Sequence, residues 1–303
     1  MVEASDIWIC TGAHLAEEVA AQVPEIPAAQ ILGEPVGRDT AAAVAWTLLS
    51  LPASLRGEVL VSLHSDHWIE DEDAFRHSLR TAVENCAAHD EVMALGVLPR
   101  WPETGYGYME LGEVSDPERG VYAVADFVEK PDAETAQRYV DSGNYVWNSG
   151  IFVFPIATLI AELERLTPEL MAGLEALADS PAELDRIYRE LPSVSIDKAV
   201  MEKLDTLSTL VLDCGWSDAG SWGSLGVLLE SDADGNCTFG ETLAVDARDN
   251  LLYSEGAMVA VLGVEGLAVV QTKDAVLVIP KERAQEVRRV IEELRRRGEQ
   301  ELL

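Results

Sequence analysis

The chain has 303 residues, is 48% hydrophobic and carries a formal net charge of −32 at pH 7. Its hydrophobic content is that of a globular protein, and its length gives one large domain or two unequal ones. The strong negative charge argues against nucleic acid or an anionic membrane as a partner, and it suits a protein adapted to high salt, where screening weakens self-repulsion.

The N-terminal residues have neither the basic region nor the apolar run of a secretory signal, and no window is apolar and long enough to span a bilayer. We therefore expect a cytoplasmic protein. The four cysteines are widely spaced and show no metal-ligand pattern, so we expect reduced thiols that are mostly buried: Cys10, Cys86, Cys214 and Cys237.

The first elements lead to a helix start with an unusual entry. An apolar run at residues 6–10 and a helical pattern at 13–23 precede Gly33-Glu-Pro-Val-Gly-Arg-Asp-Thr40, and an alanine-rich helix follows at 41–49. With Thr40 or Asp39 as the cap, free N–H groups and Arg38 alongside form an anion site. The alternative is an ordinary capped helix with a solvated arginine.

The next strand, at residues 58–63, ends in His64-Ser-Asp-His67. A buried strand that delivers an aspartate at its carboxyl end is a common way to hold Mg²⁺ beside a nucleotide, and Mg²⁺ prefers oxygen, which favours Asp66. The alternative is that Asp66 caps the acidic helix that begins near Asp71. The two histidines are more often structural or solvated than ligands in such a place.

A strand at residues 121–128 ends at Glu129 and Lys130, where Pro131 breaks it and Asp132 can start a helix. Strand ends are the usual place for ligands in open α/β sheets. Lys130 suits a phosphate, and Glu129 can accept hydrogen bonds from sugar hydroxyls. The alternative is a surface turn. The loop at residues 99–107, with two glycines, can pass closely over a substrate.

The segment at residues 145–154 predicts another strand, in which Asn148 can donate and accept hydrogen bonds and Gly150 allows close backbone approach. Helical patterns fill residues 157–190, and a short helix at 195–203 follows. A strand at 207–212 then runs into a loop that contains Asp218, either a second carboxylate for the same cation or part of a simple turn.

From Gly235 the pattern changes to strand-like runs of about five residues separated by turns, followed by an amphipathic helix at 282–294. We therefore predict a main domain at residues 1–230 and a β-rich domain at 231–303. The second has no catalytic constellation of its own, so packing or formation of a homo-oligomer is its expected role.

Seven motifs together resemble one family, the mannose-1-phosphate guanylyltransferases among the sugar nucleotidyltransferases. In family order they are Glu34-Pro-Val-Gly-Arg-Asp-Thr-Ala, Ser65-Asp-His67, Pro102-Glu-Thr-Gly-Tyr-Gly-Tyr108, Phe127-Val-Glu-Lys-Pro-Asp132, Trp147-Asn-Ser-Gly150, Ser195-Ile-Asp197 with Val200-Met-Glu-Lys203, and Gly215-Trp-Ser-Asp-Ala-Gly-Ser-Trp222. Each motif is weak alone, but seven in order are specific.

This resemblance implies an α/β fold with a doubly wound, mostly parallel, Rossmann-like sheet and a small β-rich C-terminal domain. It also implies the reaction of GTP with α-D-mannose 1-phosphate to give GDP-mannose and pyrophosphate, in which the sugar phosphate attacks the α-phosphorus in line. Another sugar 1-phosphate, such as fucose or heptose 1-phosphate, is the alternative substrate within this interpretation.

The resemblance also implies roles for single residues. Asp66 and Asp218 would hold Mg²⁺, and Lys130 would hold the sugar phosphate. The remaining positions would bind substrate: Glu129 and Asn148 at sugar hydroxyls, Gly107 along the sugar pocket, Glu34 and Arg38 in the segment that faces the nucleotide, and Asp197 and Lys203 as further members.

The sequence departs from the family at one important place. Family members open with a strand and a loop of the form Gly-Gly-x-Gly-Thr-Arg-Leu-x-Pro that cradles the triphosphate, and the 303 residues contain no such segment. His64 also replaces a more usual proline, and Asp39 a more usual asparagine. Three interpretations follow: a fragment or misassigned start, a non-catalytic regulatory relative that binds sugar nucleotide, or a loop supplied by another chain.

Overall fold

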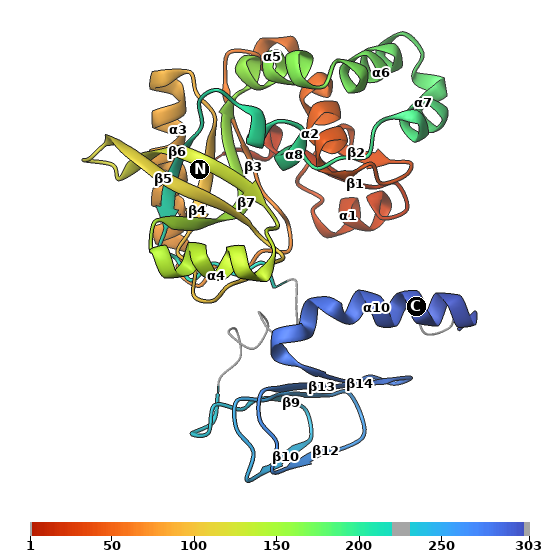
Figure 1. Cartoon of the computed structure of the whole chain (residues 1–303). Helices are drawn as coiled ribbons and strands as arrows, with labels where there is room; N and C mark the ends of the chain where they lie inside the picture. The colour runs from red at the N-terminus through yellow and green to blue at the C-terminus, as the bar shows by residue number, and fades with distance from the viewer. Residues whose placement is uncertain (1, 220–230, 300–303) are drawn as a thin grey trace. The chain divides into compact units, whose positions relative to one another are not determined.

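This computed structural model describes residues 2–219 and 231–299. The chain divides into two compact units, drawn in Figure 1. The first unit comprises residues 1–64 and 71–214, and the second comprises residues 65–70 and 215–303. The domain boundary after residue 230, predicted from the sequence, falls among residues outside the described ranges and stays a prediction.

The first unit contains a six-stranded sheet of order β3-β7-β4-β8-β6-β5 and a separate parallel pair, β1 with β2. The strands are β1 (Ile9–Gly12), β2 (Ile31–Glu34), β3 (Val59–Ser62), β4 (Met93–Val97), β5 (Gly107–Asp116), β6 (Val121–Glu129), β7 (Tyr145–Pro155) and β8 (Ser208–Leu212).

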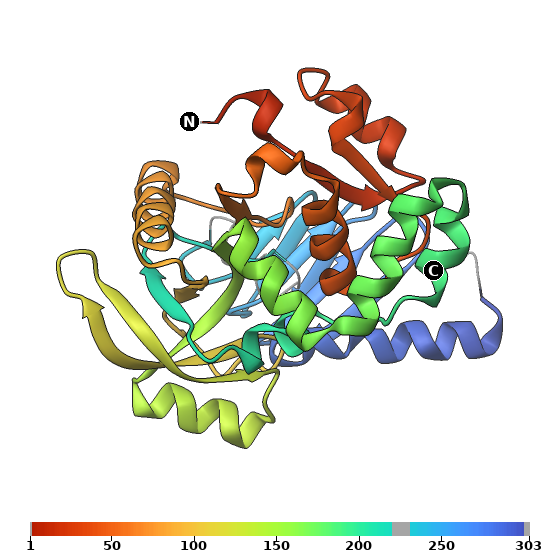
Figure 2. The same cartoon turned by 90° about the horizontal axis from the view of Figure 1, so that it is seen from above.

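The predicted α/β, Rossmann-like class is confirmed, and the six-stranded sheet is mixed rather than mostly parallel. Within it β4 and β8 pair in parallel, whereas β7 runs antiparallel to β3, β4 and β5. The strands β5 and β6 also pair antiparallel because a short turn joins them into a hairpin. Figure 2 shows this hairpin, in yellow, reaching out from the sheet.

Helices in the first unit pack on one another through an apolar core. Leu159, Leu163 and Leu170 are at most 1% exposed there. The helices are η1 (Ala4–Asp6), α1 (Ala16–Gln22), η2 (Ala28–Gln30), α2 (Asp39–Ser50), η3 (Ala53–Leu55), α3 (Glu72–His89), α4 (Ala133–Ser142), α5 (Ile156–Leu166), α6 (Pro168–Asp179), η4 (Pro181–Glu183), α7 (Leu184–Glu190), α8 (Ile196–Ala199) and η5 (Met201–Lys203).

Two helix starts show which aspartates serve as caps. The side chain of Asp132 accepts a hydrogen bond from the Thr135 N–H at 2.8 Å, as predicted for the start of α4. The cap of α3 is Asp71, which accepts from the N–H groups of Asp73 and Ala74, so capping does not account for Asp66. Among the described helices, none is both long and apolar enough to cross a membrane.

The second unit is β-rich, as the sequence predicts. Its strands are β9 (Cys237–Phe239), β10 (Thr242–Val245), β11 (Leu251–Ser254), β12 (Val259–Leu262), β13 (Leu267–Gln271) and β14 (Val276–Pro280), followed by η6 (Lys281–Glu286) and α10 (Val287–Arg297). They form a four-stranded sheet of order β14-β13-β11-β9 and a parallel pair, β10 with β12. The four cysteines of the chain form no disulfide, and three of them are buried.

Two buried asparagines join successive turns of the second unit. Asn236 and Asn250 are 1% and 0% exposed, and each directly precedes a strand. Asn250 donates to Asn236 Oδ1 at 2.9 Å and to the Val264 carbonyl at 3.2 Å, and its Oδ1 accepts from the Leu267 N–H at 2.9 Å. This network supplies hydrogen-bond partners to buried backbone groups at the starts of β11 and β13.

We expect Asn250→Ala to destabilise the second unit by about 2–4 kcal/mol, because the variant leaves several buried donors and acceptors unpaired. The measurement is calorimetric unfolding of the full chain, with exposed Glu241→Ala as the control. Unfolding of both variants at the wild-type temperature would show that the network contributes no stability.

Candidate functional site

The first group of predicted residues lies at the turn that ends β6. Lys130 Nζ is 2.6 Å from Glu129 Oε1, and the side chain of Glu129 is only 5% exposed whereas that of Lys130 is 55% exposed. Lys130 has a φ of 54°, in the left-handed region. The turn thus holds a buried carboxylate and presents an ammonium group at the surface.

Asn148, in the middle of β7, is 8% exposed and anchors a second polar segment. Its Nδ2 donates to Asp197 Oδ1 at 2.7 Å, and its Oδ1 accepts from the Gly150 N–H at 3.0 Å. Gly150 has a φ of 72°, and a Cβ there would lie 2.9 Å from His64 Nε2. Only glycine fits this position without strain.

Gly107 lies between the turn at Glu129 and Lys130 and the segment around Asn148. It is the register partner of Glu129 across β5 and β6. A Cβ at Gly107 would lie 2.6 Å from Glu129 Oε2 and 3.3 Å from Asn148 Cβ. Five of the predicted residues therefore lie at one place in the first unit: Gly107, Glu129, Lys130, Asn148 and Asp197. We call these five the β6-end cluster.

Within the β6-end cluster one ammonium group, that of Lys130, faces two carboxylates, those of Glu129 and Asp197. Burial raises the pKa of the Glu129 carboxyl above its usual range, and the hydrogen bond from Lys130 opposes this shift. Burial also raises the pKa of Asp197. Hydrogen bonds to its carboxylate, including the one from Asn148, and the charge of Lys130 oppose this shift. A ligand with hydroxyl groups and a phosphate matches this combination of acceptors and one ammonium group.

Glu34 and Arg38 form a second group, organised by Tyr188 of α7. The Tyr188 hydroxyl donates to Glu34 Oε1 at 2.7 Å, and Arg38 Nε donates to the Tyr188 carbonyl at 3.3 Å. Burial raises the pKa of Glu34. Sequence reasoning missed Tyr188, because a tyrosine in a helix is ordinarily a core residue, as its ring is here.

The start of α2 differs from the predicted anion site. The helix begins at Asp39, and Arg38 occupies the cap position without a side-chain cap. The Thr40 N–H donates to Asp39 Oδ1 at 2.8 Å and the Ala41 N–H to the Val194 carbonyl at 3.2 Å, so two donors expected to be free are engaged. Thr40 Oγ1 instead accepts from the Ile196 N–H, which ties α2 to the helix that carries Asp197.

The structure places Lys203 against its own segment and its neighbour Glu202 against the β6-end cluster. Lys203 Nζ donates to the Ala199 carbonyl at 3.3 Å, within its own segment. It is Glu202 that reaches the β6-end cluster, with Oε1 accepting from the Glu129 N–H at 2.9 Å. Glu202 was not among the predicted residues, since nothing in the pattern of residues 200–203 separates it from its neighbour.

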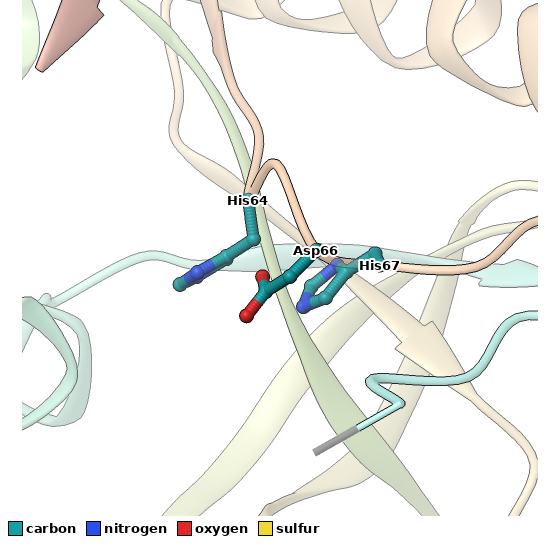
Figure 3. A group of neighbouring side chains, drawn as sticks. All are labelled: His64, Asp66 and His67. Atoms are coloured by element: carbon teal, nitrogen blue, oxygen red, sulfur yellow. The ribbon is translucent and has the colours of Figure 1, made fainter. Parts of the chain in front are cut away.

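The segment after β3 gathers three side chains with metal-ligand chemistry. Figure 3 shows His64, Asp66 and His67 close together, and one ligand atom from each lies within 4.8 Å of the others. Trp216 Nε1 donates to His67 Nδ1 at 3.1 Å, so neutral His67 carries its proton on Nε2. This bond gives His67 a structural role.

Asp218 lies on the stretch that adjoins Asp66. Trp68 and Ser217 exchange two backbone hydrogen bonds, of 2.8 and 3.0 Å, in an antiparallel bridge. Asp66 lies two residues before this bridge and Asp218 one residue after Ser217, and neither carboxylate is buried. The oxygen donors fit a hard divalent cation. The last three residues of this motif, 220–222, lie outside the described ranges.

We expect Asp197→Asn to raise the midpoint of thermal unfolding at neutral pH. Because the pKa of Asp197 is raised in the folded protein, the folded state binds its proton more tightly, and ionisation costs stability as the pH rises through that pKa. Below the unfolded pKa of about 4 this cost is absent, so the variant and wild type should converge there.

The measurement is the unfolding midpoint as a function of pH, with exposed Asp213→Asn as the matched control. A midpoint for Asp197→Asn at or below the wild-type value throughout the neutral range would contradict this assignment.

Comparison with known proteins places these groups in a family. Residues 1–234 match the nucleotidyl transferase family, and residues 240–294 match the MannoseP isomerase/GMP-like beta-helix domain. A solved structure from Thermus thermophilus, described as mannose-1-phosphate geranyltransferase, has a TM-score of 0.80 and 36% sequence identity. The alignment covers 94% of this chain and 83% of that one.

Curated relatives agree. A mannose-1-phosphate guanylyltransferase of Escherichia coli is 38% identical over 312 residues, covering 98% of this chain and 64% of the relative. The alginate biosynthesis protein AlgA of Pseudomonas aeruginosa is 37% identical over 305 residues, covering 97% and 63%. The chain thus spans less than two thirds of the length of these relatives. The resemblance seen in the motifs is confirmed, and the chain belongs to the nucleotidyl transferase family.

Proposed function

We propose that this chain transfers a guanylyl group from GTP to α-D-mannose 1-phosphate, giving GDP-mannose and pyrophosphate. The proposal depends on one observation: Gly107 of β5, Glu129 of β6 and Asn148 of β7 meet in the β6-end cluster, together with Lys130 directly after β6. The curated relatives of matching sequence support the choice of substrates.

The β6-end cluster supplies both kinds of group that a sugar phosphate requires: donors for the phosphate and acceptors for the hydroxyls. Lys130 donates one of its three N–H groups to Glu129, which leaves two in position for phosphate oxygens. Glu129, Asn148 and Asp197 supply acceptors for the sugar hydroxyls. A Cβ at Gly107 would lie 2.6 Å from Glu129 Oε2, so the absence of a side chain there lets the Glu129 carboxylate pack against the backbone of β5, beside the proposed sugar site.

The reaction asks the protein mainly to position groups and to neutralise charge. The phosphate oxygen of the bound sugar attacks the α-phosphorus of GTP in line, and pyrophosphate leaves. Lys130 keeps the attacking phosphate oriented and offsets part of its charge. Glu34 and Arg38, fixed by Tyr188, would contact the nucleotide.

Nucleotidyl transferases generally use a divalent metal ion. We propose Mg²⁺ held by Asp66 and Asp218, whose carboxylates belong to adjoining stretches. When bound, the ion would draw electron density from the α-phosphate and stabilise the leaving pyrophosphate. Lys203, whose Nζ donates to the Ala199 carbonyl, stays a proposed substrate contact.

A second function is a non-catalytic one, in which the chain binds sugar nucleotide and regulates a partner. In this alternative the 303 residues, which contain no Gly-Gly-x-Gly-Thr-Arg-Leu-x-Pro loop, bind the sugar nucleotide without turnover. In the described residues, β1 pairs only with β2 and β3 only with β7, so each leaves an edge without a neighbouring strand.

The test of the proposed function is pyrophosphate release from GTP and mannose 1-phosphate with Mg²⁺, at low and high salt. We expect turnover, and we expect Asp218→Asn to lower it by about a hundredfold or more, because the variant removes a charge at the proposed metal site. Exposed Asp234→Asn is the control. A folded wild-type chain that binds GDP-mannose without turnover would contradict the catalytic proposal and favour the regulatory one.

The role of Lys130 is tested by Lys130→Gln, which keeps a long polar side chain and the left-handed backbone demand but removes the charge. We expect KM for mannose 1-phosphate to rise roughly ten- to hundredfold, and KM for GTP to change little. Steady-state kinetics measure both constants, and exposed Lys273→Gln serves as the control. An unchanged KM for the sugar phosphate would remove Lys130 from the phosphate site.

A further inference from the structure

Strand β6 is paired along its length on one side, but on the other side its pairing ends before the β6-end cluster. On the β5 side the pairing extends to Gly107 and Glu129. On the other side β8 pairs only with Val121, Tyr122 and Ala123. The Glu129 N–H donates to Glu202 Oε1 at 2.9 Å, so a side chain from η5 supplies the acceptor where no strand continues.

Lys130, the residue after Glu129, has a strained backbone that neighbouring hydrogen bonds must hold in place. Lys130 adopts a φ of 54°, a conformation that disfavours residues other than glycine and persists when the surroundings fix it. Two hydrogen bonds flank the Glu129 Cα: the Glu129 N–H bonds to Glu202, and the Lys130 N–H bonds to the Tyr106 carbonyl at 3.3 Å. Together they fix the direction in which both side chains leave the turn.

We infer that Glu202 is a positioning residue for the sugar phosphate, acting through the Glu129 peptide to hold Glu129 and Lys130 in their binding orientation. This inference rests on the proposed function. Glu202 itself is exposed and touches the cluster through the backbone, so its contribution is separate from that of the groups that contact the ligand.

The acceptor oxygen of Glu202, rather than its charge, carries this role. The negative charge of Glu202 is one of the smaller causes that raise the pKa of Glu129, so the charge opposes ionisation of the cluster. A peptide N–H requires only an acceptor, which glutamine also provides. Glu202→Gln should therefore keep the hydrogen bond to the Glu129 N–H and the conformation of the turn. Glu202→Ala should remove this hydrogen bond and let the turn move.

The experiment compares Glu202→Ala, Glu202→Gln and the control Glu134→Ala, an exposed residue of α4. Hydrogen exchange at the Glu129 amide is measured by NMR without substrate, and KM is measured for mannose 1-phosphate and for GTP. We expect the alanine variant alone to exchange faster and to raise KM for mannose 1-phosphate roughly tenfold, with KM for GTP unchanged.

Three results would overturn the inference: an alanine variant that behaves as wild type, a glutamine variant as impaired as alanine, or equal rises in both KM values. If the wild-type chain shows no turnover, the proposed function fails by itself. Amide exchange and calorimetric binding of mannose 1-phosphate then decide the role of Glu202: unchanged exchange in Glu202→Ala rejects it, and faster exchange with weaker binding, both restored by glutamine, upholds it.

Discussion

The site depends on one ion pair between neighbouring residues, the ammonium of Lys130 and the nearly buried carboxylate of Glu129. A chain with a net charge of −32 and five lysines has few cations with which to hold a phosphate. Lys130 also lowers the pKa of Asp197, so the same cation offsets two carboxylates. Because the side chain of Lys130 is half-exposed, the ion pair contributes little to the stability of the fold. The same exposure leaves N–H groups of the ammonium accessible to a ligand.

The fold of the first unit brings residues from several separate segments to this pair. The hairpin of β5 and β6 places Gly107 opposite Glu129, and β7 delivers Asn148 from the other side. Helix α8 then supplies Asp197, and η5 supplies Glu202. Thr40 ties α8 to the start of α2, so the segment with Glu34 and Arg38 is fixed to the same framework.

Local chemistry explains which parts could be predicted from the sequence. Periodicity and turn residues located the strands around Glu129 and Asn148, and Asp132 was recognised as a cap because capping is a local interaction. The direction of β7 within the mixed sheet could not be inferred, since pairing is set by distant segments. The roles of Tyr188 and Glu202 also depend on distant partners, 154 and 73 residues away, which the local pattern around each residue does not reveal.

The proposed binding of the sugar phosphate at the β6-end cluster can be tested by a crystal structure of the full chain with mannose 1-phosphate. We expect phosphate oxygens within hydrogen-bond distance of Lys130 Nζ, and sugar hydroxyls on Glu129 and Asn148. A sugar phosphate bound elsewhere, with the Lys130–Glu129 pair unchanged, would contradict this binding site.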